Sequence, residues 1–417
     1  MTSLAREPWF QEPGLTRIFT LLNADGGEGR VVGGAVRNSL MALPVSDIDI
    51  ATTLRPEVVM ERAAAAGIKA VPTGIEHGTV TLVLNGKPFE VTTLRKDVET
   101  DGRRAIVAFS TDWQADAERR DLTINALYVG ADGEVIDLVG GLPDIEKRNV
   151  RFIGDAATRI AEDYLRILRF FRFFAYYGSG RPDADGLRAC AAARAKLASL
   201  SAERVWSEMK KLLSAEDPGR ALLWMRQVGV LTEILPETEK WGIDAIPALI
   251  SAEQILGWRS DPLLRLAAIM PPDVVRLEQL AVRLRLSNTE AAALTGWALA
   301  PAIKDDLSLS ALDRLLYRYG ANGITMRLKL ATAAARGKAE TNPDEMSRTA
   351  RLGRLLDRAQ TWKKPVLPVS GADIINSGIP AGPRVGELLS ALEHDWLEGN
   401  FSADREALLA RLKEMTK

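Results

Sequence analysis

The feature that most restricts the fold is a change of sequence pattern near residue 140. Between Arg30 and about Asp137, short runs rich in β-branched residues alternate with turns, and Asn85-Gly86 predicts a hairpin between two of them. After "DLVGG" (Asp137–Gly141), Ala, Leu, Arg and Glu recur at helical spacing almost to the end. The pattern therefore predicts an α/β head and an all-helical remainder. Helices in and before the head are expected at Leu15–Asn23, Ala35–Met41 and Pro56–Ala66.

The length of the chain implies more than one domain. Its 417 residues exceed the size at which single hydrophobic cores stop growing, roughly 250 to 300 residues. With 47% apolar and 26% charged residues, the composition is that of a folded globular protein. Thr361–Gly371 is the best linker candidate. We expect an α/β head at 1–138 and three helical units at 139–213, 214–287 and 288–417.

Charge, cysteine and histidine content exclude several classes of protein. The formal net charge of −1 gives no general attraction to polyanions, so any such binding must be local. A single cysteine, Cys190, excludes an internal disulfide framework, and no signal-peptide or membrane-spanning run is visible, so a cytoplasmic location is expected. With only His77 and His394, the His394-Asp395 pair is interpreted as a helix surface rather than as a metal-phosphohydrolase site.

A glycine pair in "VVGGAVRNSLMALPVSDIDIATT" provides the first candidate binding motif. Gly33-Gly34 follows a predicted strand and precedes a predicted helix, so backbone N–H groups and the helix dipole would favour an anion there. Arg37 adds a cation that can hold a phosphate with two hydrogen bonds. Neither a Walker loop nor a dinucleotide fingerprint is present. A glycine turn of this kind can also be purely structural.

Two aspartates in the same stretch predict a metal site. Asp47 and Asp49 alternate with Ile48 and Ile50, and the period of a strand would place both carboxylates on one face, about 6 to 7 Å apart. Such a pair is unfavourable without a cation between the carboxylates, and Mg²⁺ prefers oxygen ligands. The alternative, a solvated strand edge, is weakened by the flanking isoleucines.

The order of these motifs matches a nucleotidyltransferase site. Asp-x-Asp after a Gly-Gly/Arg turn is the arrangement in which two metal ions activate an attacking hydroxyl and hold a triphosphate. A third carboxylate would come from a neighbouring strand, and Glu90 in "FEVTTLR" is the candidate. No spacing rule fixes Glu90, so a solvent-facing strand residue remains the alternative.

A third motif, "ERRDLTINAL" (Glu118–Leu127), offers nucleotide contacts. Arg119 and Arg120 can reach phosphates, while Asp121 and Asn125 can read a ribose hydroxyl, which distinguishes ribonucleotides from deoxyribonucleotides. A surface charge run that leads into a strand explains the same residues equally well.

The fourth motif, "EDYLRILRFFRFF" (Glu162–Phe174), predicts one amphipathic helix with a possible base-reading pair. Asp163 and Arg166 would complement the amino donor and ring-nitrogen acceptor that cytosine and adenine share, and would mismatch guanine and uracil. Arg169, one turn later, is also placed among the nucleotide contacts. An ordinary helix ion pair is the alternative.

Together these motifs resemble the class II tRNA nucleotidyltransferase and bacterial poly(A) polymerase family. The four head motifs, with "DLVGG" among them, cover roughly the first 175 residues, and "LAVRLRLSN" and "GIPAGPRVGELL" resemble later segments of its CCA-adding members. The resemblance implies a polymerase-β-like head followed by a helical neck that recognises the base, a body, and a tail that binds tRNA. Asn38 departs from the family, which usually has Asp after the arginine.

The resemblance also assigns roles to the candidate residues. Asp47 and Asp49 would hold Mg²⁺ and, with Glu90, form the catalytic acids. The triphosphate would lie at the glycine turn and Arg37. The nucleotide and its base would contact Arg119, Arg120, Asp121, Asn125, Asp163, Arg166 and Arg169.

Among the activities of the family, addition of CCA to tRNA 3′ ends from CTP and ATP is expected. The segment "LRKDVETDGRRAIVAF" disfavours a CC-only enzyme, and a mobile loop near Arg95–Val107 would switch the base from C to A. Eight Lys or Arg from Lys147 to Arg181 fit a tRNA acceptor stem. Poly(A) synthesis, A-only addition, a small-molecule nucleotidyltransferase and an inactive RNA-binding protein remain alternatives. No membrane and no stable protein partner are expected.

Overall fold

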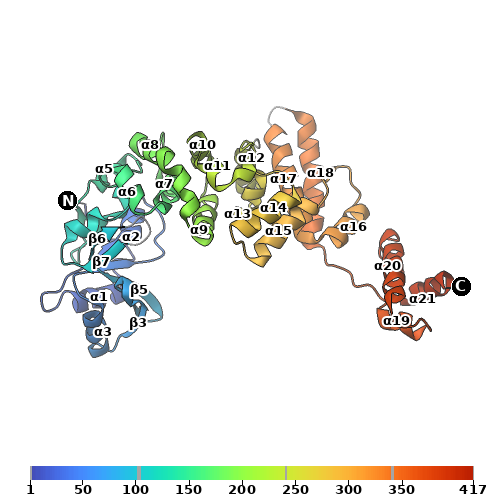
Figure 1. The fold of residues 1–417 in the computed structure, drawn as a ribbon, viewed down its shortest axis with the longest axis horizontal. Helices are drawn as coiled ribbons and strands as arrows, with labels where there is room; N and C mark the ends of the chain where they lie inside the picture. The colour runs from blue at the N-terminus through green and yellow to red at the C-terminus, as the bar shows by residue number, and fades with distance from the viewer. Residues whose placement is uncertain (1, 101–104, 240–241, 340–341, 417) are drawn as a thin grey trace. The chain divides into compact units, whose positions relative to one another are not determined.

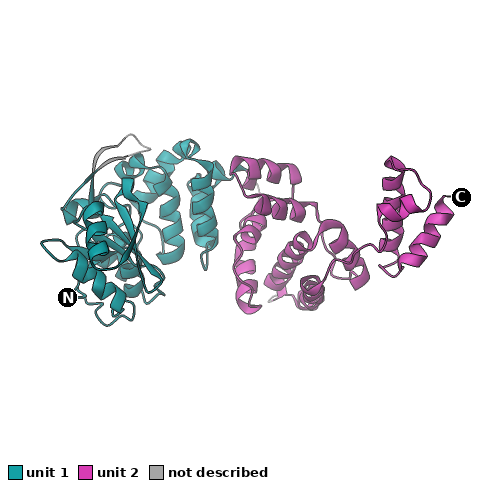
Figure 2. Cartoon of the chain, turned by 90° about the horizontal axis from the view of Figure 1, so that it is seen from below, with its two compact units in different colours: residues 1–236 teal, residues 237–417 magenta. Residues whose placement is uncertain are grey.

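The computed structural model describes residues 2–100, 105–239, 242–339 and 342–416. The chain forms two compact units, residues 1–236 and residues 237–417, coloured separately in Figure 2. The four domain ranges expected from the sequence subdivide these units more finely and stay a prediction.

A seven-stranded mixed sheet organises the head. Its strand order is β3-β4-β5-β2-β1-β8-β9, and among these strands only the neighbours β2 and β5 run parallel. The predicted turn Asn85-Gly86 joins β4 to β5, with positive φ at both residues as a tight hairpin requires. The strands are β1 (Gly29–Val32), β2 (Asp49–Thr52), β3 (Lys69–Gly74), β4 (Thr79–Leu84), β5 (Lys87–Thr93), β8 (Leu127–Val129) and β9 (Val135–Asp137).

Short helices and a separate hairpin complete the head. The three helices expected there are confirmed as α1 (Pro13–Leu22), α2 (Gly34–Leu40) and α3 (Pro56–Ala65). The hairpin β6 (Arg95–Thr100) and β7 (Ala105–Phe109) forms its own sheet, so most of the segment near Arg95–Val107 that was expected to be a switching loop is strand. Residues 101–104 lie outside the described residues. The remaining short elements are η1 (Ile75–His77), α4 (Trp113–Glu118), η2 (Thr123–Asn125) and α5 (Gly141–Glu146).

An apolar cluster fixes the strands and helices that surround the later site. Val32 of β1, Ala51 of β2, Ala117 of α4 and Tyr128 of β8 are buried in one cluster. In the three strands these residues alternate with residues on the opposite face, so packing the cluster also sets which strand side chains point away from it.

Helices make up the rest of the first unit, as the sequence predicts (Figure 1). One of them is α7 (Leu165–Tyr177), whose Phe170 stacks on Phe152 with ring centroids 5.2 Å apart. Burial of each such aromatic side chain contributes roughly 1.5 to 3 kcal/mol, which anchors α7 against the head. The others are α6 (Ala156–Glu162), α8 (Ala184–Ala193), η3 (Arg194–Ser199), α9 (Ala202–Leu213), α10 (Gly219–Gln227) and α11 (Val230–Ile234).

The described residues of the second unit are helical, with no strand. One core lies among the helices from α16 to α18 and a second lies among the last three helices, around Ile374, Leu392 and Trp396. Residues 362–370, within the predicted linker, contain no helix. The elements are η4 (Pro236–Thr238, at the junction), α12 (Ala245–Ile255), α13 (Pro262–Ala268), α14 (Val274–Arg283), α15 (Asn288–Leu299), α16 (Leu309–Tyr319), α17 (Ala321–Ala339), α18 (Pro343–Thr361), α19 (Gly371–Asn376), α20 (Pro383–Glu398) and α21 (Arg405–Met415).

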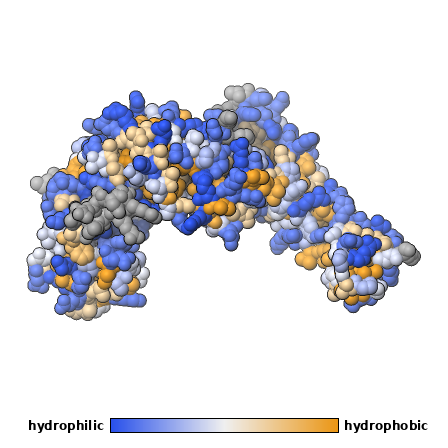
Figure 3. Space-filling model, in the orientation of Figure 1, coloured by the Kyte–Doolittle hydropathy of each residue, from blue (hydrophilic) through white to orange (hydrophobic). Residues whose placement is uncertain are grey.

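The face drawn in Figure 3 is mainly hydrophilic, and hydrophobic residues occur on it in small separate groups. Within the part of the chain that the structure describes, no helix combines the length and the apolar character needed to cross a membrane.

Candidate active site

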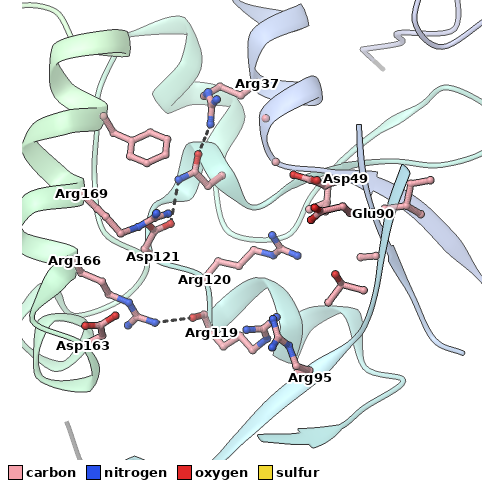
Figure 4. A pocket seen from close by; sticks show the side chains of 18 of the residues that line it. Arg37, Asp49, Glu90, Arg95, Arg119, Arg120, Asp121, Asp163, Arg166 and Arg169 are labelled. Atoms are coloured by element: carbon pink, nitrogen blue, oxygen red, sulfur yellow. Dashed lines mark hydrogen bonds and ion pairs between the residues drawn. The ribbon is translucent and has the colours of Figure 1, made fainter. Parts of the chain in front are cut away.

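One polar pocket of about 750 Å³ in the first unit gathers nearly all the residues predicted from the sequence (Figure 4). It lies where the start of α2, strands β2 and β5, the segment after α4, and α7 meet. Every predicted site residue lines the pocket except Asp47. Those that do are Gly33, Gly34, Arg37, Asp49, Glu90, Arg119, Arg120, Asp121, Asn125, Asp163, Arg166 and Arg169.

The glycine turn has the conformation that its sequence predicts. Gly33 has φ +74° and sits directly before α2, in a region that only glycine adopts without strain. A Cβ atom here would also lie 3.6 Å from the backbone oxygen of Asn125. The first turn of α2 therefore begins at the pocket, with backbone N–H groups at the position expected for a phosphate.

Asp49 and Glu90 form the acidic side of the pocket. They are direct partners in the parallel pairing of β2 with β5, and their side chains lie next to each other in Figure 4. Burial raises the pKa of Asp49, and the negative charges of Glu90 and Asp47 raise it further, against the opposing effect of Arg120. We call Asp47, Asp49 and Glu90 the acidic cluster.

Asp47 does not occupy the strand position predicted for it. Strand β2 begins at Asp49, because its partner β1 ends at Val32 and turns away at Gly33. Asp47 therefore lies in the exposed segment before the strand, where its Oδ2 accepts a hydrogen bond from Ser46 Oγ at 2.8 Å. The prediction that Asp47 lies in the strand was wrong, but the predicted alternation is present. Asp47 and Asp49 are exposed while Ile48 and Ile50 are buried, and the charge of Asp47 acts on Asp49.

Arg37 is buried and held by uncharged partners. Its Nη1 donates to Asn125 Oδ1 at 2.5 Å, its Nη2 donates to Tyr177 Oη at 2.8 Å, and its Nε and Nη2 both donate to Asn38 Oδ1. Its guanidinium also lies 4.0 Å from the centre of the Tyr177 ring. Burial lowers the pKa of Arg37, because none of these neutral partners fully replaces the lost hydration. At the unusual Asn38, an amide therefore supports the arginine.

A hydrogen-bonded chain joins Arg37 to Arg169. From Asn125, Nδ2 donates to Asp121 Oδ1 at 3.1 Å, and Arg169 Nε donates to Asp121 Oδ2 at 2.6 Å. Burial alone would raise the pKa of Asp121, but Arg169 and these hydrogen bonds lower it overall. Asp121 and Asn125, predicted as ribose contacts, thus also orient the two arginines across the pocket (Figure 4).

Asp116, which sequence reasoning missed, holds both Arg119 and Arg120. Arg119 Nη2 lies 2.8 Å from Asp116 Oδ1 and Arg120 Nη2 lies 2.9 Å from Oδ2. Tyr128 Oη donates to Oδ2 at 2.9 Å, and the backbone N–H of Arg95 donates to Oδ1 at 3.4 Å. Burial would raise the pKa of Asp116, but the two arginines lower it overall. The signal in the sequence was an acid three and four residues before two arginines.

The predicted base-reading pair lies at a break between two helices. Helix α6 ends at Glu162 and α7 begins at Leu165, so the single helix expected over Glu162–Phe174 was wrong. Asp163 is extended at the end of α6, and its side chain accepts from the N–H of Leu165 at 3.0 Å, a local bond that competes with continuation of α6. Asp163 and Arg166 nevertheless line the same pocket.

Each member of this pair has a fixed partner. Arg204 Nη2 lies 2.6 Å from Asp163 Oδ2, and Arg166 Nη1 forms an ion pair with Glu162. Arg166 also donates to the backbone oxygens of Arg159, at 2.8 Å, and Arg119, at 3.2 Å. These contacts hold the carboxylate and the guanidinium before any nucleotide binds.

Arg172 is a further pocket residue that the sequence analysis missed. It pairs with Glu208 of α9 at 2.9 Å and continues the series Arg166, Arg169, Arg172 at intervals of three, which was a usable signal. We call Arg119, Arg120, Arg166, Arg169 and Arg172 the arginine cluster. Thr92 and Arg95 also line the pocket, and neither was predicted.

Family models match two parts of the chain. Residues 29–151 match the poly A polymerase head domain, which contains the sheet and the acidic cluster. Residues 182–241 match a model described as the probable RNA and SrmB-binding site of polymerase A.

Relatives match the chain over nearly its whole length. It is 35% identical to the mitochondrial CCA tRNA nucleotidyltransferase 1 of Mus musculus, covering 99% of this chain and 93% of that protein. It is 33% identical to the CCA-adding enzyme of Geobacillus thermodenitrificans, covering 99% and 98%. The crystal structure of the Bacillus stearothermophilus CCA-adding enzyme in complex with CTP has a TM-score of 0.77 and 28% identity, covering 98% of each chain.

Fold, pocket and relatives together define a nucleotidyltransferase with a polymerase-β-like head and a helical remainder. The chain belongs to the family of CCA-adding tRNA nucleotidyltransferases. Membership of this family implies use of a divalent metal ion.

Proposed function

We propose that this enzyme adds CCA to the 3′ ends of tRNA from CTP and ATP, without a nucleic-acid template. The observation that carries the proposal is the pocket that places paired acids opposite an arginine cluster, in a chain whose full-length relatives are CCA-adding enzymes. The B. stearothermophilus relative was crystallised with CTP, which supports a nucleoside triphosphate in the corresponding pocket.

In this proposal the tRNA 3′-hydroxyl attacks the α-phosphate of the nucleotide. A bond forms between the 3′-oxygen and the α-phosphorus, the bond to the β-phosphate bridging oxygen breaks, and pyrophosphate leaves with that electron pair. The hydroxyl proton passes to solvent. The glycine turn and the charges of Arg37, Arg119 and Arg120 would hold the triphosphate in line for this displacement.

The acidic cluster fits a divalent ion, which we propose is Mg²⁺. Among the described residues no group of three or more Asp, Glu, His or Cys side chains encloses a metal by itself. Mg²⁺ commonly uses one or two carboxylates and completes its shell with water and substrate phosphates, so Asp47 and Asp49, with Glu90 beside them, are a suitable donor set. The chemistry that bound Mg²⁺ supplies is activation of the hydroxyl and neutralisation of phosphate charge.

Base choice is proposed to depend on Asp163 and Arg166. Held by Arg204, Asp163 presents an acceptor to the pocket; held by Glu162, Arg166 presents a set of donors. Cytosine and adenine match this pattern, while guanine and uracil would leave buried polar groups unpaired.

The binding partners are proposed to be tRNA, CTP and ATP. The basic residues between Lys147 and Arg181 would contact the acceptor stem, and the helical second unit would contact the rest of the tRNA. The cytoplasm is the proposed compartment and fits a single buried cysteine, although the names of the mouse and human relatives place those proteins in mitochondria.

Product lengths test the proposal directly. tRNA transcripts that end before CCA, after C and after CC are each offered CTP, ATP or both, with Mg²⁺. Completion of CCA followed by arrest supports the proposal. A single A on the CC end alone indicates A-only addition, a long ladder indicates poly(A) synthesis, and tRNA binding without incorporation indicates an inactive RNA-binding protein.

A further inference from the structure

A second pocket, of about 440 Å³, lies within the helical second unit and has an aliphatic lining. It is formed by residues of α12, α13, α15, α17 and α18 and of the loops beside them, and α17 packs along α18 (Figure 1). Its lining includes Leu249, Ala268, Met270, Ile303 and Ala331. The volume is within the range of about 300 to 1,000 Å³ that is typical of small-molecule sites.

The pocket contains an arginine with no acidic partner. Arg327 Nη2 donates to the backbone oxygen of Ala298 at 3.1 Å, and the guanidinium lies 5.1 Å from the centre of the Trp297 ring. None of the described carboxylates pairs with it, and burial alone lowers its pKa. Arg348, the other cation in the lining, differs because Glu345 at 3.3 Å and Asp305 at 3.8 Å balance its charge.

Two buried donors of this lining have no acceptor among the described residues. They are Nε of Arg327 and the indole Nε1 of Trp297, whose side chain is only 3% exposed. Both atoms are closed to solvent, so they show that the surroundings of the guanidinium are poor in acceptors and do not themselves offer hydrogen bonds to a ligand. An anionic ligand in the pocket would give the Arg327 guanidinium the counter-charge that no described carboxylate supplies.

We propose that this pocket binds a small amphipathic carboxylate, with its head at Arg327 and its aliphatic chain against the alanine, leucine and methionine side chains. The aliphatic lining favours such a ligand over an RNA nucleotide, because a ribose would leave its hydroxyls unpaired there. The site contains none of the residues assigned to nucleotidyl transfer, so ligand binding there can be tested independently of that activity.

Calorimetry with the full-length protein tests the proposal. The probes are decanoate below its micelle-forming concentration, the neutral decanol, acetate and CMP. Decanoate is expected to bind at least about tenfold more tightly than decanol, since a charged hydrogen bond contributes more than 1.4 kcal/mol, and acetate is expected not to bind. Equal binding of decanoate and decanol, or no binding of decanoate, would overturn the proposal.

Variants locate the binding. Arg327→Met keeps the apolar stem and should remove the preference for decanoate over decanol. Ala331→Leu fills part of the cavity and should weaken both ligands. Arg354→Met, at an exposed arginine of α18 outside the lining, is the matched control and should bind as the unmodified protein does.

Circular dichroism and the melting temperature establish that each variant is folded. If Arg327→Met fails to fold, Ala331→Leu decides the question. Unchanged decanoate affinity in the folded variants contradicts the site. Binding of CMP that is lost with Arg327→Met identifies an RNA contact instead and also overturns the carboxylate assignment.

Discussion

The acidic cluster and the arginine cluster line one pocket but differ in how their charges are balanced. Each carboxylate that supports the arginine cluster already has a cationic partner, and Asp116 and Asp121 consequently have lowered pKa values. In the acidic cluster, like charges crowd together and the pKa of Asp49 is raised. The arginine side is thus organised before the substrate arrives, whereas the acidic side is relieved only when a cation binds.

The largest expected effect comes from the acidic cluster. Asp49→Asn should reduce CTP incorporation by at least about 10²- to 10³-fold, the loss typical when a group that stabilises transition-state charge is removed. The free energy of unfolding should not fall, because the substitution removes a carboxylate that Glu90 and Asp47 repel. Radiolabelled CTP incorporation and urea denaturation measure the two quantities.

The exposed Glu57 of α3, changed to Gln, is a matched control for charge loss in the same head. Asp47→Asn should lose incorporation in the same way if it also binds the metal. Full activity of both aspartate variants would falsify the assignment of the cluster.

Removal of the carboxylate beneath two arginines should affect folding as well as activity. Asp116→Asn leaves Arg119 and Arg120 without their shared partner and should lower the free energy of unfolding by about 3 kcal/mol, as is usual when one member of a buried ion pair is lost. The KM for CTP should rise. Glu118→Gln, at an exposed position of the same helix, should change neither quantity. If Asp116→Asn were as stable as the unmodified protein, Arg119 and Arg120 would not need the Asp116 carboxylate to stay in place.

A smaller effect is expected on the choice of base. Asp163→Ala should raise incorporation of UTP or GTP relative to CTP by roughly tenfold to a hundredfold, which corresponds to loss of a hydrogen bond to a charged group. Arg204→Met, which frees Asp163 without removing it, should give a smaller shift of the same sign. Competition assays with paired nucleotides measure both ratios. An unaltered preference in Asp163→Ala would leave base selection to other residues.

The smallest expected effect is a difference in pH dependence. The pKa of Asp49 is raised, so its contribution to stability is fully present below its ordinary pKa of 3.8 and is lost as pH rises through the raised value. The pKa of Asp121 is lowered, so its contribution is present above 3.8 and is lost as pH falls. The free energy of unfolding is measured with urea between pH 3 and 7 for the unmodified protein, Asp49→Asn and Asp121→Asn. The difference between the unmodified protein and each variant should change with pH in opposite directions for the two aspartates. If both differences changed with pH in the same direction, the two clusters would not differ in how their charges are balanced.

Local motifs were the part of the site that sequence could predict. The glycine turn and the arginines of the fourth motif depend on short-range geometry, and the structure places them in one pocket. Glu90 lies there because β5 pairs with β2, which no local spacing indicates. The prediction about Asp47 was wrong because the limits of a strand depend on partners that are distant in sequence. The start of β2 is set by the end of its partner β1, which leaves Asp47 outside the strand.

The fold class was predictable for a similar reason. Strand alternation and helical spacing are local properties, so the α/β head and helical remainder followed from them. The break before α7 was missed because the bond from the N–H of Leu165 to the side chain of Asp163 competes with helix continuation, and spacing alone does not reveal that competition. Asp116 was missed because its arginine neighbours were assigned to phosphates, with no account of what would hold them.

The hydrogen bond from Arg95 N–H to Asp116 has a mechanical consequence. It ties the root of the β6–β7 hairpin to the same carboxylate that grips Arg119 and Arg120. Because the hairpin and the two arginines share this carboxylate, a displacement of Arg95 would reach both of the cations that are proposed to hold the incoming nucleotide.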